Sequence, residues 1–339
     1  MSRRVRAALS LILFFTLSLA RADPVSDFYR DKTLTVVSAG EAGGAHGAYG
    51  RLIAAHIRKY IPGNPAVNMQ YMIGAGGNLA MNYLFNAAPK DGAYIGVPLQ
   101  DLVFNARLGV AAVKYDAGKI HYLGGADTTR TILTVMKSSG VASLDDARAK
   151  EVLIGASGAS GQNYMIPFVL NGLLGTRFRV VTGYPGIALI HLAMERGEVQ
   201  GTAASWPVIA ATKPQWIEGK LINNLVAIAM EREPSLPDTP ALGELLTKPE
   251  DLSLVPMLAG SAALGRAWAA IGDIPADRLA ALREAFARTL EDPGFLEEAR
   301  QAGLPVAPVS WRTQEDIAVQ ILATPDATVA RLKRMVGID

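Results

Sequence analysis

Three glycine-rich loops constrain the fold of this chain more than any other feature, because each follows a predicted strand and precedes a predicted helix. The loops are Gly40–Gly47, Gly74–Asn78 and Gly155–Gln162. Short runs rich in β-branched or alternating apolar residues predict the strands before them, at 33–38, 67–71 and 152–155. Repeated strand–loop–helix order is typical of an α/β fold with a largely parallel sheet.

The strand–helix order occurs twice along the chain. After a first unit that ends with a strand at Tyr94–Val97, the pattern restarts with strands at Thr131–Met136, Phe178–Thr182 and Val199–Ala203. The last third of the sequence is mostly helical, and no low-complexity linker separates the units. A chain of 339 residues fits two domains. We therefore expect two α/β lobes packed around a cleft.

Composition removes several classes of function. Beyond the first 22 residues, 29 basic residues face 31 acidic ones, so nothing indicates a surface for nucleic acid. The chain has no cysteine, which excludes disulfides, thiolate catalysis and cysteine-bound metal. The four histidines never stand four residues apart, as a helical zinc pair would. We expect no metal and no cofactor.

The N-terminus has the pattern of an export signal. Arg3, Arg4 and Arg6 precede an apolar stretch over Ala7–Ala20, and Ala20-Arg21-Ala22 forms a small–x–small cleavage pattern. The apolar stretch is shorter than the about 20 residues that a membrane span needs. Residues 1–22 are therefore predicted to be a signal peptide cleaved near Ala22, which would leave a periplasmic protein without a membrane anchor.

The glycine loops can serve as simple turns or as anion sites. A helix N-terminus presents unpaired N–H groups and a partial positive charge, so it can hold a carboxylate without a basic side chain. Three such loops in two units favour anion binding over three ordinary turns. The phosphate-loop, dinucleotide and hydrolase-elbow patterns do not fit these loops. A periplasmic hydrolase or lyase that uses His46 with Ser157 or Ser160 remains the alternative.

A series of short motifs spans the chain from about Phe28 to about Val309. In order they are Phe28-Tyr29-Arg30, Ala42-Gly43-Gly44 with Tyr49-Gly50-Arg51, Ile61-Pro62-Gly63-Asn64-Pro65, Gly74-Ala75-Gly76-Gly77-Asn78, Ala88-Pro89-Lys90-Asp91-Gly92, Gly183-Tyr184-Pro185-Gly186, Arg196-Gly197-Glu198-Val199, Pro234-Ser235-Leu236-Pro237-Asp238-Thr239-Pro240 and Ile274-Pro275-Ala276-Asp277-Arg278. With these motifs the chain resembles the extracytoplasmic solute receptors of the tripartite tricarboxylate transporters, the Bug family.

This resemblance implies a type II periplasmic-binding-protein fold, with two doubly wound α/β lobes around a ligand cleft. It implies a first lobe over 23–126, a second lobe over 127–229, and a return to the first lobe over 230–339 that includes the C-terminal helices. It also implies a periplasmic solute-binding protein that captures a small organic carboxylate and delivers it to the membrane subunits of a transporter. We expect a monomer that performs no catalysis.

The predicted ligand-binding residues come from the three glycine loops, to which the resemblance adds Tyr184–Gly186 and Gln200. They are Gly40, Glu41, Gly43, Gly44, His46, Gly47, Gly74, Ala75, Gly76, Ser157, Ala159, Ser160, Gly161, Gln162, Tyr184, Gly186, Gln200 and Trp206. Trp206 is included because it follows the predicted strand end at Ala203-Ala204-Ser205. Ser157, Ser160 and Gly161 precede a helix whose N–H groups are expected to hold one ligand carboxylate.

Two positions depart from the resemblance. The family usually has Asp where this chain has Gly47 and Gln200, whereas Glu41 adds an acid to the first loop. An ammonium group in the cleft would need a carboxylate partner, because burial of an unpaired charge is costly. We expect Glu41 to turn toward solvent or toward Arg51. The ligand is then predicted to be a carboxylate without an ammonium group, its remainder lying against Tyr184 and Trp206.

Overall fold

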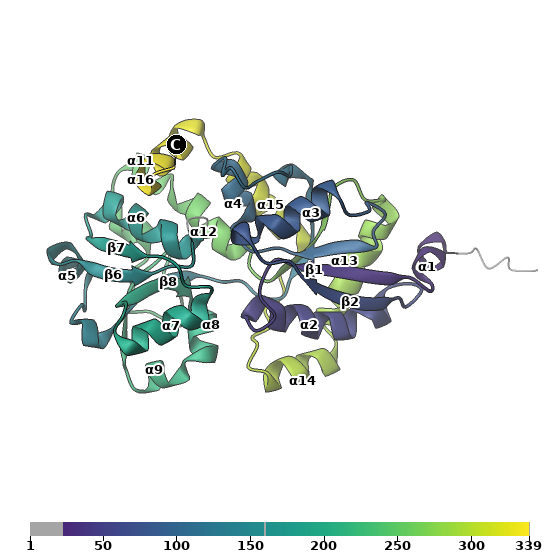
Figure 1. The fold of residues 1–339 in the computed structure, drawn as a ribbon, viewed down its shortest axis with the longest axis horizontal. Coiled ribbons are helices and arrows are strands. Elements are labelled where there is room, and N and C mark those ends of the chain that lie inside the picture. The colour runs from purple at the N-terminus through teal and green to yellow at the C-terminus, as the bar shows by residue number, and fades with distance from the viewer. Residues whose placement is uncertain (1–22, 159–160, 339) are drawn as a thin grey trace, which may run out of the picture.

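The computed structural model describes residues 23–158 and 161–338, and these form two α/β lobes with one five-stranded sheet each (Figure 1). The strands are β1 (Thr33–Ser38), β2 (Ala66–Tyr71), β3 (Tyr94–Val97), β4 (Ile120–Gly125), β5 (Thr131–Met136), β6 (Val152–Gly155), β7 (Phe178–Val181), β8 (Gly201–Ser205), β9 (Ile222–Ala227) and β10 (Ala267–Ile271). The larger helices are α2 (Ala45–Ile57), α3 (Asn78–Asn86), α6 (Gln162–Leu174), α7 (Ile187–Arg196), α12 (Val255–Ala263), α13 (Ala276–Leu290), α14 (Pro293–Gln301), α15 (Trp311–Leu322) and α16 (Asp326–Val336).

Within the described residues, seven shorter α-helices lie between these elements or at the N-terminal end. They are α1 (Pro24–Tyr29), α4 (Leu102–Arg107), α5 (Leu144–Ala149), α8 (Trp206–Thr212), α9 (Pro214–Glu218), α10 (Leu242–Leu245) and α11 (Pro249–Leu252). The predicted signal peptide over residues 1–22 and the predicted ligand residues Ala159 and Ser160 lie outside the described residues. No helix within residues 23–158 and 161–338 combines the length and the apolar character needed to cross a membrane.

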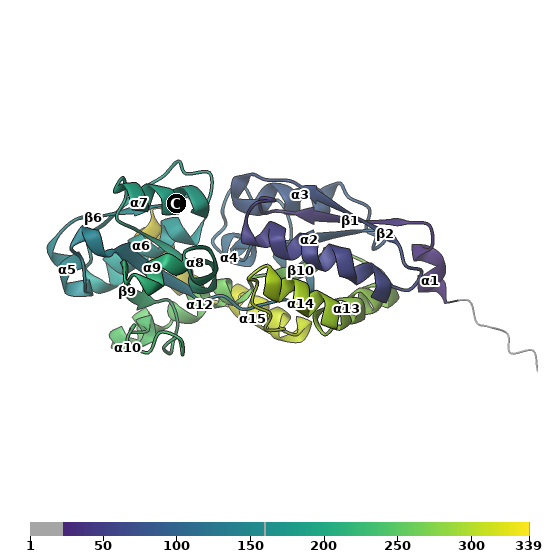
Figure 2. The same ribbon diagram turned by 90° about the horizontal axis from the view of Figure 1, so that it is seen from below.

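The sheet of the first lobe has the strand order β2-β1-β3-β10-β4. β1 pairs in parallel with β2 and β3, and β10 inserts antiparallel between β3 and β4. Five of the six residues of β1 are buried, because helices cover both faces of this sheet. Figure 2 shows α3 on one side of β1 and α2 on the other. The predicted parallel unit is confirmed, whereas the sequence analysis does not predict β10.

The sheet of the second lobe has the order β7-β6-β8-β5-β9. β6 pairs in parallel with β7 and β8, while β5 runs antiparallel to β8 and β9. Every residue of β5 is buried, as expected for a central strand of a covered sheet. The strand predicted at 199–203 begins and ends two residues later, and Val199 is instead buried against Ile190 and Met194.

Two apolar cores hold the first lobe together. On one face of its sheet, Ile53 of α2 and Phe286 of α13 pack with Val36. On the other face, Met81 of α3 and Ile321 of α15 belong to a core that continues into the second lobe. This shared core places the two sheets side by side with the carboxyl ends of several strands directed at the cleft.

The chain changes sheets between β4 and β5 and again between β9 and β10. The residue boundaries proposed at 126/127 and 229/230 remain predictions. The expectation that the C-terminal helices return to the first lobe fails for α16, which packs along α6 of the second lobe and contacts the first through the ion pair of Asp326 with Arg107. The physical reason is the apolar face of α16, where Val329, Leu332 and Val336 are buried.

Candidate functional site

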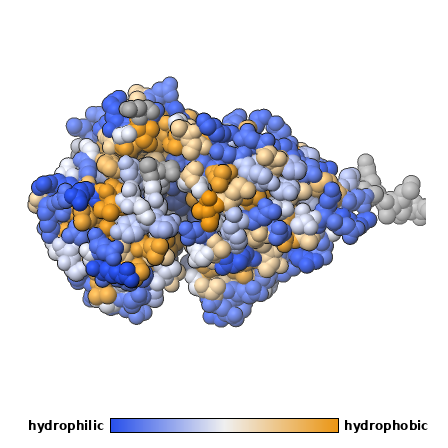
Figure 3. Space-filling model, in the orientation of Figure 1, coloured by the Kyte–Doolittle hydropathy of each residue, from blue (hydrophilic) through white to orange (hydrophobic). Residues whose placement is uncertain are grey.

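A cavity of about 430 Å³ lies between the two lobes. The segments that follow β1, β3, β6 and β8 all contribute to its walls, so it sits at the carboxyl ends of the strands, where ligands bind in open α/β sheets. Figure 3 shows the surface hollowed between the lobes at this place. The predicted ligand residues that line the cavity are Gly40, Glu41, Gly44, His46, Gly74, Gly76, Ser157, Gly161, Gln162 and Gly186.

Other predicted ligand residues do not line this cavity. They are Gly43, Gly47, Ala75, Tyr184, Gln200 and Trp206. Gln200 precedes β8, at the end of that strand opposite to the cavity, and its Oε1 accepts a hydrogen bond of 2.8 Å from Leu153 N. Tyr184 and Trp206 pack partly buried against an apolar cluster beneath α7 and α8. The apolar wall expected from these two rings is formed instead by Ile73, Leu99, Ile187 and Val208.

The first loop is held close to the start of α2, which explains the glycine at position 47. A Cβ on Gly47 would lie 2.2 Å from the carbonyl oxygen of Glu41, so a larger residue would collide with the loop backbone. A Cβ on Gly40 would likewise lie 2.7 Å from His46 Cβ. Ser38 fixes the start of the loop, since its Oγ accepts from Gly40 N at 3.2 Å. In this conformation the chain has no room for Asp at position 47.

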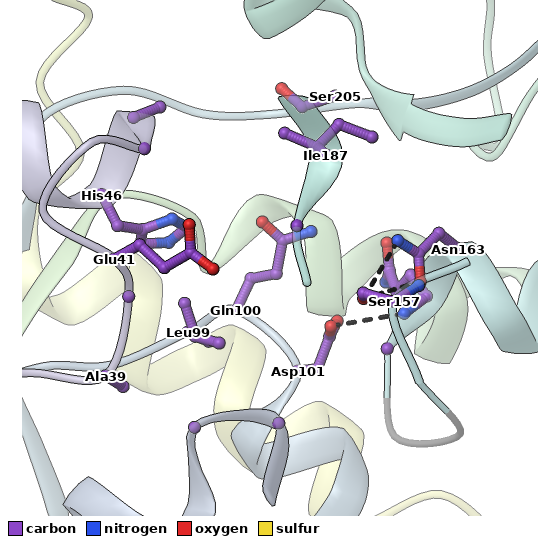
Figure 4. Close-up of a pocket in the computed structure, with 18 of the residues that line it drawn as sticks. Ala39, Glu41, His46, Leu99, Gln100, Asp101, Ser157, Asn163, Ile187 and Ser205 are labelled. Atoms are coloured by element: carbon purple, nitrogen blue, oxygen red, sulfur yellow. Dashed lines mark hydrogen bonds between the residues drawn. The ribbon is translucent and has the colours of Figure 1, made fainter. Parts of the chain in front are cut away.

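Glu41 faces the cavity, and the predicted outward orientation is wrong. Its carboxylate oxygens lie 3.3 and 3.4 Å from the point where a Cβ on Gly186 would stand, so the side chain reaches across the cleft toward the start of α7 (Figure 4). Arg51 does not hold it outward, because Arg51 Nη1 donates to the carbonyl oxygen of Ala42 instead. The tight first loop directs Glu41 inward.

Arg266 is a first cavity residue that the sequence did not reveal. It precedes β10, lines the cavity and is only 4% exposed. Its guanidinium lies 5.5 Å from the centre of the Tyr49 ring, and its buried Nε has no hydrogen-bond partner among the described residues. Burial lowers the pKa of this guanidinium, although the nearby Asp127 carboxylate acts in the opposite direction. An anion in the cavity would add to the compensation that Asp127 gives.

His46 lies beside Arg266 and is held neutral. Arg266 Nη1 lies 3.2 Å from His46 Nδ1. Burial lowers the pKa of His46 well below its ordinary value, and the charge of Arg266 lowers it further. His46 therefore adds no positive charge to the cavity. Because it already accepts from Arg266, the ring helps to fix the guanidinium at the cavity wall.

Asp101 is a second residue that sequence reasoning missed. It follows β3 at the same sheet edge as the glycine loops, and a position directly after a predicted strand would have indicated this place in the sequence. Its Oδ1 accepts from Ser261 Oγ at 2.8 Å and its Oδ2 from Gln162 N at 3.4 Å. Burial raises the pKa of the carboxyl group to about 6. Asp101 thus links the first lobe to the start of α6 in the second (Figure 4).

The start of α6 is therefore already occupied by groups of the protein. Gln162 N donates to Asp101, and its side chain accepts from Thr131 Oγ1 at 2.6 Å and donates to Leu258 O at 3.2 Å. The Ser157 hydroxyl bonds with the Asn163 amide at 3.2 to 3.3 Å. In this conformation, the expected contact of a ligand carboxylate with the N–H group of Gln162 is taken by Asp101.

The charges and surfaces around the cavity define what it can bind. Among the described residues that line it, Arg266 is the one cation, while Glu41 and Asp101 are acidic. No group of three or more His, Asp or Glu residues in the described ranges is placed to hold a metal ion. Ile73, Leu99, Ile187 and Val208 supply apolar wall. This arrangement suits a small, partly apolar molecule with at least one carboxylate.

Solved structures share this architecture, although no protein-family profile and no curated protein matches the sequence. The periplasmic binding protein BugD aligns with a TM-score of 0.66 at 17% identity, over 92% of this chain and 99% of its own. Rpa4515 of R. palustris, solved with adipate, aligns with a TM-score of 0.66 at 21% identity, over 91% and 98%. MatC (Rpa3494) of Rhodopseudomonas palustris, with bound malate, aligns with a TM-score of 0.65 at 20% identity, over 90% and 99%.

At these identities the likeness establishes the fold. Each alignment covers nearly the whole of the solved protein and both lobes of this chain. The doubly wound lobes of this chain and the cavity between them agree with the fold of these solved proteins. The chain therefore has the type II periplasmic-binding-protein fold, as its motifs predict.

Proposed function

We propose that this protein is a periplasmic solute-binding receptor of the Bug family that captures a small organic carboxylate between its lobes. The observation that carries the proposal is Arg266, a buried cation on the wall of the interlobe cavity with an unpartnered Nε. A carboxylate would accept hydrogen bonds from the guanidinium and neutralise it. Closure of the two lobes would then exclude water from this contact and strengthen it.

Two structural neighbours support a carboxylate ligand. Rpa4515 was solved with adipate and MatC with malate, both of which are carboxylic acids. The motif resemblance also supports a partner, which we propose to be the membrane subunits of a tripartite tricarboxylate-type transporter. The arginine cluster and apolar stretch at the N-terminus support export, with mature protein beginning near Asp23.

A hydrolase or lyase with His46 and a serine is less well supported. His46 contacts Arg266, and the Ser157 hydroxyl contacts Asn163. Nucleophilic catalysis needs the base within hydrogen-bond reach of the hydroxyl, and these contacts direct the two groups to other partners. Ser160 lies outside the described residues. We therefore propose binding without covalent chemistry, so that the captured solute is returned unchanged.

The test is a thermal-shift screen of the mature chain against organic acids, followed by calorimetry on those that bind. A ligand at 100 times its Kd adds about 2.7 kcal/mol to the stability of the folded state and raises Tm. Arg266→Gln is expected to weaken binding by about 10- to 100-fold, the effect of losing a charge-assisted hydrogen bond. Arg266→Lys keeps the charge and controls for misfolding. If no carboxylate raises Tm, the proposed function is wrong.

A further inference from the structure

The cavity holds two opposite charges that do not neutralise each other. Arg266 and Glu41 both line it. Neither forms an ion pair with a described residue. Arg266 Nη1 lies 3.2 Å from His46 Nδ1, and His46 belongs to the same glycine loop on the cavity wall as Glu41. A molecule placed there would meet a cation and an anion at once.

Resting on the proposed function, we propose that the solute is a zwitterionic amino acid whose carboxylate binds Arg266 and whose ammonium group binds Glu41. Such a molecule carries both charges within one small group and bridges the two side chains. It compensates the buried cation and gives the Glu41 carboxylate a charged donor. A carboxylate without an ammonium group would satisfy Arg266 alone.

Glu41 is better placed for this role than Asp101. The carboxylate of Asp101 already accepts from Ser261 Oγ and from Gln162 N, so its oxygens are committed to the protein. Glu41 makes no such hydrogen bond to a described side chain, and the close packing of Gly47 against the loop holds its backbone in place. Its inward direction therefore needs no rearrangement of the first lobe.

The same two acids select against a second carboxylate on the ligand. A dicarboxylate bound at Arg266 would bring its other negative group into a cavity that contains Glu41 and Asp101 but no further cation among the described lining residues. Like charges repel strongly where water is excluded. The remainder of the solute is expected to be neutral and to contact Ile73, Leu99, Ile187 and Val208. The inferred class is thus an α-amino acid with an uncharged side chain.

The inferred ligand charge is the reverse of the one expected from the sequence, because Glu41 points into the cavity and not outward. Gly47 and Gln200 carry no carboxylate, but neither residue lines the cavity, so neither bears on the charge of the ligand.

The experiment is calorimetry with matched pairs of acids that differ only in the amino group. The pairs are alanine and propanoate, leucine and 4-methylpentanoate, and phenylalanine and 3-phenylpropanoate. At least one amino acid is expected to bind about tenfold or more tightly than its partner, since a charged hydrogen bond contributes that much. Glu41→Gln should remove this preference and leave binding of the amino-free acid equal or tighter.

Glu218→Gln is the matched control, because Glu218 is exposed on α9, outside the cavity, and the substitution removes the same charge. It should leave every affinity unchanged. If the amino-free acids bind more tightly, or if Glu41→Gln keeps the preference for the amino acid, the inference is wrong while the receptor function stands. If neither member of any pair binds and no other carboxylate does, the proposed function itself fails.

Discussion

Replacement of Asp101 by Asn should stabilise the ligand-free protein at neutral pH and lose this effect in acid. Burial raises the pKa of Asp101 from 3.8 to about 6. Between these values the folded state binds a proton that the unfolded chain has released, so the free energy of unfolding falls as pH rises from about 4 to about 6. At 1.36 kcal/mol for each pKa unit, the cost of the ionised group above pH 6 is at most about 3 kcal/mol.

The expected gain is smaller than this limit. Asp101 is only partly buried, and Asn offers an N–H group where Asp101 Oδ2 accepts from Gln162 N. Partial exposure and the mismatch with Gln162 N both reduce the gain in the free energy of unfolding, which is expected to be about 1–2 kcal/mol at pH 7.5. Urea unfolding of both proteins at pH 4.5 and 7.5 measures it, with the exposed Asp238→Asn as control. An equal difference at both pH values, or a loss of stability at pH 7.5, would refute the reasoning.

A stabilising result would show that the protein retains Asp101 at a cost in stability. Charged groups that are poorly solvated are kept where function needs them, and stability is commonly lower there. Asp101 joins the lobes through Gln162 N and Ser261 Oγ, so the same variant should also change the ease with which the lobes separate. Small-angle scattering of the ligand-free variant would reveal a larger radius of gyration if this contact holds the lobes together.

Three further predictions concern stability. Burial lowers the pKa of His191 to about 4, so the free energy of unfolding should fall by up to about 3 kcal/mol as pH falls from 6.5 to 4. In the His191→Leu variant this fall should be smaller, which urea unfolding at pH 5 and 7.5 would show. Hydrogen bonds from Lys59 and Tyr60 hold the pKa of Asp292 well below its usual range. Asp292→Ala should therefore lower the free energy of unfolding by about 2–3 kcal/mol above pH 5 and by less below pH 3. Urea unfolding that finds the same loss at both pH values would contradict this. Gly47→Ala should cost about 1–3 kcal/mol in thermal unfolding, because its Cβ would meet Glu41 O, and an unchanged Tm would argue against the loop geometry.

Part of the site could be predicted from the sequence because it follows the fold. Once strands are recognised at 33–38 and 152–155, the residues after them must lie at the carboxyl edge of a sheet, and Gly40 and Ser157 do line the cavity there. Asp101 obeys the same rule after β3, so its place at the cavity can also be predicted from the sequence. Gln200, which the resemblance suggests as a ligand residue, does not line the cavity, because it stands before β8, where the chain enters the sheet at the opposite end.

The α/β order, the glycine loops and the two-lobed class of fold can be predicted from the amino-acid sequence, because they depend on periodicities and turn residues that act over a few positions. The charges of the cavity depend instead on how distant segments come together. Arg266 reaches the cleft because β10 returns to the first sheet between β3 and β4, and Glu41 points inward because α2 packs closely on its own loop. Both depend on contacts between segments that no local pattern specifies, since the direction of a side chain is set by what the folded chain packs against it.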